Sequence, residues 1–101
     1  MMSEILTRQV KRKLNITWDD EDTNARVDDI MESVSPYLRH KLGVSAEFDF
    51  SAPGTERDLF LSCCLYEWNH ITRDEWEENY KYTIATVRAQ YEVAHYLAEK
   101  E

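Results

Sequence analysis

The sequence predicts an all-α fold, a small bundle of about four helices with an extended arm between the second and third. The chain has 101 residues, enough for a single domain over residues 1–101 with one core but not for a second. It contains only 2 Gly and 2 Pro, whereas sandwiches and barrels need many such residues in their turns. Apolar residues also recur at intervals of three and four along four segments, the spacing of a helix face.

The first helix is expected over Ser3 to Leu14, with Ser3 as the N-cap and with Ile5, Leu6, Val10 and Leu14 toward the core. The second is expected over Asp20 to Leu42. The second carries one continuous apolar stripe and is followed by Gly43, the residue type preferred just after a helix end. Pro36 lies inside it and lacks the amide hydrogen that a helix interior needs. We therefore expect a kink or break near residues 34–35.

The third helix is expected from Thr55 to about Ile71 and is apolar on nearly all sides, which places it centrally. The fourth is expected from Thr72 or Arg73 to Leu97 and carries two apolar stripes on nearly opposite faces. One stripe can serve this chain's core, and the other favours a neighbouring subunit. The alternative is that its Tyr and Ala residues are simply tolerated in water. The stripes are Trp76, Tyr80, Ile84, Val87, Tyr91, Ala94 and Tyr82, Ala85, Ala89, Val93, Tyr96.

Residues 44–51 alternate between apolar and polar side chains, the period of a half-buried strand, yet no second strand is predicted to pair with them. Two interpretations stay open. The segment is either an extended arm that packs Phe48 and Phe50 onto its own helices, or an arm that docks on another chain. Under the second, Val44, Phe48 and Phe50 are partner contacts, as are Tyr82, Val93 and Tyr96 of the fourth helix.

The net charge is −8, and the acidic residues are clustered. Residues 19–33 hold seven acids against one arginine, a field that repels a nucleic-acid backbone. The first helix is basic, and its cations are candidate contacts to an acidic partner or to the acidic block of another copy; a solvated helix face is the alternative. The candidate residues are Arg8, Lys11 and Arg12 for the basic surface, and Asp19, Asp20, Glu21 and Asp22 for channel-facing or inter-subunit acids.

We expect no catalytic, cofactor-binding or metal-binding residues, and no enzyme. Asp20-x-Asp22-x-Asn24 matches the start of an EF-hand loop, but Ala25 and Met31 stand where that loop needs Gly and Glu. The three histidines lack metal-ligand spacing. Adjacent Cys63 and Cys64 fit small apolar residues of a buried helix. No apolar run reaches the ~18 residues of a membrane span and no signal peptide is recognisable, so we expect an intracellular protein without membrane contact.

Several short motifs, in order, resemble the small helical head–tail connector (head-completion, adaptor or DNA-packaging) proteins of tailed bacteriophages. They cover nearly the whole chain, and their order and spacing are more specific than any one of them. They are Glu4-Ile5-Leu6-Thr7, Val10-Lys11-Arg12-Lys13-Leu14, Ile16-Thr17-Trp18-Asp19-Asp20, Tyr37-Leu38-Arg39, Lys41-Leu42-Gly43, Asp49-Phe50-Ser51, Pro53-Gly54, Glu56-Arg57-Asp58-Leu59, Tyr66-x-Trp68-Asn69 and Glu77-Glu78-Asn79-Tyr80.

The resemblance implies a ring of copies of this chain in the phage neck, between the portal protein and a downstream neck or tail protein. Such a ring extends the channel through which DNA passes without specific binding. The location implied is the virion, after assembly in the bacterial cytoplasm, with a phage or prophage origin. The acidic balance suits a conduit to which DNA does not adhere.

Two other classes of function compete with this one. A small acidic helical binding protein, such as a DNA mimic or an inhibitor of a nucleic-acid enzyme, uses the same negative charge, but it needs acids spread along one face rather than clustered at 19–33. A metal-dependent enzyme built on helix carboxylates lacks the Glu-x-x-His pairs that such sites use. For a ring component, replacing Phe48 and Phe50 with Ser, or Val93 with Glu, is expected to leave a folded monomer that does not assemble.

Overall fold

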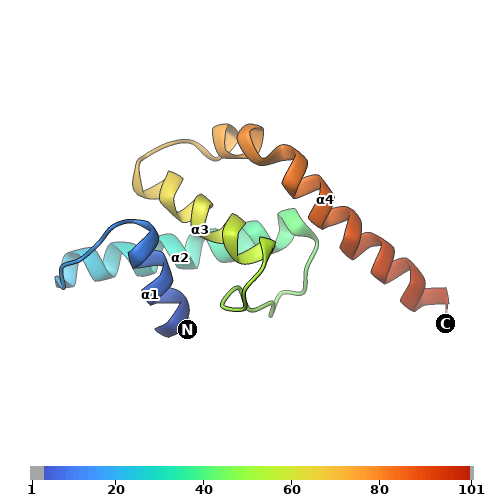
Figure 1. The fold of residues 1–101 in the computed structure, drawn as a ribbon, viewed down its shortest axis with the longest axis horizontal. Coiled ribbons are helices and arrows are strands. Elements are labelled where there is room, and N and C mark those ends of the chain that lie inside the picture. Colours follow the sequence, from blue (N-terminus) through green and yellow to red (C-terminus); the bar gives the residue numbers. More distant parts are fainter. Residues whose placement is uncertain (1–3, 101) are drawn as a thin grey trace.

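A computed structural model describes residues 4–100 and contains four α-helices over that range, with no strand. The helices are α1 (Glu4–Lys13), α2 (Glu21–Leu42), α3 (Thr55–Trp68) and α4 (Arg73–Lys100) (Figure 1). The predicted all-α bundle is therefore confirmed. The expected N-cap Ser3 lies outside the described residues.

α2 and α3 form the centre of the bundle. Each contacts the other and both remaining helices, whereas α1 and α4 make no contact with each other over the described range. The molecule is elongated, 51 × 27 × 19 Å, because the C-terminal half of α4 extends away from the bundle at the end opposite α1 (Figure 1). Beyond Tyr91, residues 92–99 of α4 are all exposed.

The core is built from the apolar stripes of the helices. On α2 the stripe is fully buried, and on α3 buried side chains occur on most sides, as expected of a central helix. The aromatic ring of Phe50, from the loop between α2 and α3, stacks on Phe60 with ring centroids 4.9 Å apart. The main members are Leu6, Val10, Val27, Met31, Val34, Leu38, Leu42, Phe50, Leu59, Phe60, Cys63, Cys64, Trp76 and Val87.

The first three helices end in the same way, with one residue of positive φ followed by an apolar residue that turns back onto the last helical turn. The positive-φ residues are Asn15 (60°), Gly43 (72°) and His70 (60°). The next amide donates to a carbonyl five residues earlier, at 2.9 Å after Asn15, 3.1 Å after Gly43 and 2.9 Å after His70. For this reason α3 ends at Trp68 rather than at the predicted Ile71.

Pro36 does not interrupt α2, so the predicted break near residues 34–35 is wrong. Val34 and Leu38, on either side of the proline, are completely buried, and this packing holds the helix through the missing hydrogen bond. The hydroxyl of Ser35 donates to the carbonyl of Met31 at 2.7 Å. Pro36 itself is exposed, so the carbonyl of Glu32 that it leaves without an amide partner lies on the solvent side.

Side-chain caps begin α2 and α4. The carboxylate of Asp20 accepts from the amide of Thr23 at 3.0 Å, and the hydroxyl of Thr72 accepts from the amide of Glu75 at 3.2 Å. Each cap satisfies one amide that the first helical turn cannot pair internally. The two starts are therefore specified by contacts between residues three positions apart.

Candidate functional site

Of the two predicted stripes of α4, the first is mostly buried or half-buried and the second is exposed. Trp76 and Val87, on the first stripe, are buried in the core, whereas Tyr82 is 80% exposed and Val93 57% exposed on the second. Tyr96, on the same stripe, is 55% exposed. The prediction that only one face of this helix serves the chain's own core is confirmed. The other face, together with the projecting half of α4, is an apolar surface open to a partner.

The loop over residues 43–54 packs on its own chain, the first of the two interpretations left open. Phe50 is 1% exposed, so its prediction as a partner contact is wrong: burial against Phe60 removes its ring from water. Phe48 and Val44 are half-buried against the same core, and Phe48 meets the ring of Tyr91 edge-on at 6.3 Å. The backbone forms turns here rather than a strand.

Polar contacts fix this loop in place. The guanidinium of Arg39 donates to the carbonyl of Phe48 from two nitrogens, at 2.8 and 3.0 Å. The hydroxyl of Tyr91 donates to the carboxylate of Glu56 at 2.6 Å, which ties α4 to the start of α3. Burial, followed by that carboxylate, raises the pKa of Tyr91 to about 12. These contacts hold the loop as part of the bundle rather than as a detached arm.

The basic residues of α1 divide into two groups. Lys11 is half-buried and donates to the side-chain oxygen of Asn24 at 2.6 Å, which makes it a link between α1 and α2. Arg8 and Arg12 are exposed and share a face with Ile5, whose side chain is 59% exposed. On this face of α1 a partner can therefore reach one apolar side chain beside two guanidinium groups, with the exposed Glu4 next to Arg8 at its edge.

The four predicted acids at residues 19–22 are all exposed. Asp20 caps α2, and the carboxylate of Asp19 accepts from the side-chain nitrogen Nδ2 of Asn24 at 2.8 Å. The segment that resembles the start of an EF-hand is thus organised by hydrogen bonds within the protein. Its carboxylates still present a concentrated negative charge to solvent, and the side chain of Asn24 joins Asp19 to Lys11 of α1.

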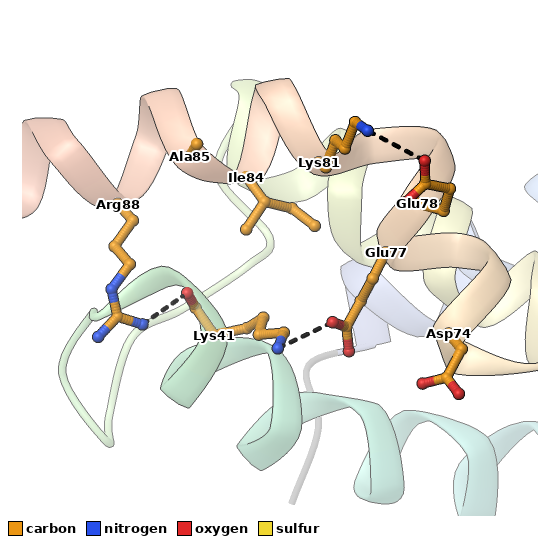
Figure 2. Close-up of a pocket in the computed structure, with 8 residues that line it drawn as sticks. All are labelled: Lys41, Asp74, Glu77, Glu78, Lys81, Ile84, Ala85 and Arg88. Atoms are coloured by element: carbon orange, nitrogen blue, oxygen red, sulfur yellow. Dashed lines mark hydrogen bonds and ion pairs between the residues drawn. The ribbon is translucent and has the colours of Figure 1, made fainter.

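An open groove of about 460 Å³ lies between the end of α2 and α4, and Figure 2 shows the charged groups around it. Lys41 pairs with Glu77 at 2.9 Å. Arg88 donates to the carbonyl of Lys41 at 3.0 Å and to that of His40 at 3.3 Å, capping the end of α2. Lys81 is paired with Glu78 at 3.0 Å. These cations already have partners within the chain. The contacts of Lys41 and Arg88 beside the groove hold α2 and α4 together.

No reactive arrangement is assembled elsewhere in the described residues. Burial raises the pKa of Cys63 to about 12, and it raises the pKa of Cys64 as well, which keeps both thiols protonated and poorly nucleophilic at neutral pH. Over residues 4–100 no group of three or more His, Cys, Asp or Glu side chains is placed to hold a metal ion. Within the same part of the chain, no helix has the length and apolar character needed to cross a bilayer.

The sequence did not indicate several exposed apolar residues, or the residue that links α2 to the end of α3. Besides Ile5, the large apolar side chains of Trp18 and Leu97 are exposed, at 51% and 57%. Arg26 donates to the carbonyl of Trp68 at 2.7 Å and lies 4.1 Å above the Trp68 ring, so it secures the end of α3. Contacts of this kind join residues more than forty positions apart, and no local pattern predicts them.

Comparisons of the chain with protein-family models, with curated proteins and with solved structures gave no match.

Proposed function

We propose that this protein is a structural component of a tailed-bacteriophage neck that assembles as a ring between portal and tail and extends the DNA channel. The observation that carries the proposal is the uncovered apolar face of α4, on a helix that extends beyond its own bundle. A helix with Tyr82 and Val93 open to water gains stability when a neighbour covers it. Repetition of one such contact around an axis produces a closed ring.

The distribution of charge supports a conduit rather than a DNA-binding surface. The exposed acids at 19–22 belong to the acidic block over residues 19–33, which contains seven acidic residues and one arginine. DNA binding requires cations that replace the counterions of the phosphates, and this block supplies the opposite charge. A channel wall with this charge lets DNA pass without adhering. In this proposal the partners are other copies of the chain, the portal protein and a downstream neck or tail protein.

The first test is the native mass of the purified protein over a range of concentrations, measured by sedimentation velocity. A closed ring supports the proposal, because closed cyclic symmetry fits a neck component and not a DNA mimic. The second test is capture by tailless phage heads that carry a portal. The matched variants are Val93→Glu, on the uncovered face of α4, and Ala94→Glu, exposed on the other side of the same helix.

Capture of the wild type and of Ala94→Glu, but not of Val93→Glu, supports a neck function that uses this face. A protein that is neither a ring nor captured by heads contradicts the proposal. If the same protein forms a salt-sensitive complex with a basic nuclease or polymerase, the acidic binding protein becomes the better assignment, because screening weakens contacts made by exposed carboxylates.

A further inference from the structure

Two surfaces of the molecule are complementary in both polarity and charge, and they lie at opposite ends. On α4, the C-terminal half carries Val93 and Tyr96 on its outer face, with Glu92 and Glu99 along one edge. Glu92 is paired with Arg88 of the same helix at 3.0 Å, and its side chain is 67% exposed, so its carboxylate stays open to a partner. At about 100° per residue the two glutamates lie on nearly the same side of the helix. We call this set the acidic α4 surface. It combines an exposed apolar stripe with an exposed negative border.

The second surface is the face of α1 formed by Ile5, Arg8 and Arg12, which we call the basic α1 surface. Ile5 is 59% exposed, and both arginines are exposed. Residues three, four and seven apart lie on one side of a helix, so the isoleucine and the two guanidinium groups can meet the same partner. Over residues 4–100 neither arginine forms an ion pair, whereas most other arginines of the bundle donate to carbonyls or carboxylates.

We propose that the acidic α4 surface of one copy binds the basic α1 surface of the next copy. Val93 and Tyr96 would cover Ile5, while Glu92 and Glu99 would face Arg8 and Arg12. The rise of 1.5 Å per residue separates the two arginines by about 6 Å and the two glutamates by about 10 Å along their helices. Arginine and glutamate side chains are long enough to bridge that difference.

The two surfaces cannot meet within one copy. α1 and α4 make no contact over the described residues, and the far end of α4 lies at the opposite end of the molecule from α1 (Figure 1). The contact is therefore head-to-tail and joins two different surfaces, which generates a ring when the rotation between copies closes. This inference deepens the proposed ring and rests on it for the choice of a second copy as the partner.

Each exposed ion pair contributes little to affinity, so charge serves here chiefly to select partner and orientation. An acidic chain repels its own copies on average, since every copy carries −8. The basic α1 surface is an exception to that repulsion and directs the approach of the α4 end. Assembly is consequently expected to weaken as salt concentration rises.

A charge-swap experiment tests the contact. One variant carries Arg8→Glu with Arg12→Glu, and the other carries Glu92→Lys with Glu99→Lys. Sedimentation velocity is run on each variant alone and on an equimolar mixture, and circular dichroism checks that helicity is retained. The matched control is Asp28→Lys with Asp29→Lys, which makes the same change in net charge as the second variant at two exposed α2 positions outside both surfaces.

The expected result is that wild type and control assemble, that each variant alone remains monomeric, and that the mixture assembles. In the mixture, each α4 surface finds an α1 surface of opposite charge. The proposal is overturned if the wild type stays monomeric at every concentration, if either variant alone assembles like the wild type, or if the mixture fails to assemble. Capture of the wild type by portal-bearing heads in any of those cases would leave the neck function standing and reject only this contact.

Discussion

The indole nitrogen of Trp76 donates a hydrogen bond of 2.9 Å to the hydroxyl oxygen of Ser62, and both side chains are buried. The same hydroxyl donates to the carbonyl of Leu59 at 2.9 Å. This chain of bonds joins the middle of α3 to the first turns of α4. It allows a large aromatic side chain to be buried without leaving its polar atom unsatisfied.

Ser62→Ala is expected to reduce the free energy of unfolding by about 1–3 kcal/mol, because the indole N–H loses its partner in the interior. Urea unfolding followed by circular dichroism measures the effect. In a Trp76→Phe background the same substitution should cost less, since no indole N–H remains to be satisfied. Equal costs in the two backgrounds would show that the hydrogen bond contributes nothing.

Phe50→Ala is expected to destabilise the fold by about 3–5 kcal/mol, the range for deleting a buried aromatic ring. Phe48→Ala should cost less, because Phe48 is only half-buried. The matched pair, compared by urea unfolding, distinguishes a core residue from a docking residue. If Phe50→Ala retained wild-type stability, the ring would be available to a partner after all.

Much of the fold was predictable because local sequence determines it. The 3–4 spacing of Val27, Met31, Val34 and Leu38 defines one face of α2, and all four are completely buried. Asp20 and Thr72 begin helices through bonds to amides three residues away. Signals of this kind need no knowledge of the rest of the chain.

The errors arose where tertiary contacts decided the outcome. Pro36 normally disrupts a helix, but buried neighbours on both sides hold α2 together. The alternation at 44–51 suggested a strand. Instead, the ring of Phe50 stacks on Phe60, ten residues away, and the segment forms turns. For the candidate site, the outer face of α4 was predictable from two opposing stripes. The exposure of Ile5 beside Arg8 was not, because apolar residues of α1 were assigned to the core together.

The hydrogen bond from Tyr37 to Glu77, with Lys41 on the other carboxylate oxygen, makes part of the stability pH-dependent. The Tyr37 bond, followed by that from Lys41, lowers the pKa of Glu77 below its usual 4.5. Burial, followed by Glu77, raises the pKa of Tyr37 above its usual 10.0. A lowered carboxyl pKa stabilises the fold above pH 4.5, and a raised phenol pKa stabilises it below pH 10.0.

Tyr37→Phe should therefore lower the Tm at pH 7, where both groups are in the protonation states that the fold favours. The difference from wild type should shrink as the pH falls below 4.5 through the lowered pKa of Glu77, where the carboxylate becomes protonated in the folded state. Thermal unfolding at pH 7 and at an acidic pH in that range measures this change. Tyr82→Phe, at an exposed position, is the control and should show no such pH dependence. A Tm difference that stays constant between the two pH values would contradict the assigned coupling.

Val93→Glu is expected to leave the free energy of unfolding within about 0.5 kcal/mol of wild type, the usual range for an exposed position, while it abolishes self-assembly. Val93 is 57% exposed and lies on the α4 face that its own bundle leaves uncovered. A carboxylate there costs nothing in the monomer, since water solvates it, but in an apolar contact it would be buried beside Glu92 and lose that solvation. Ala94→Glu adds the same charge one residue further on, toward the opposite side of the helix. If sedimentation shows that both variants assemble, or that neither does, the uncovered face is not the contact, because only a specific interface distinguishes these neighbouring positions.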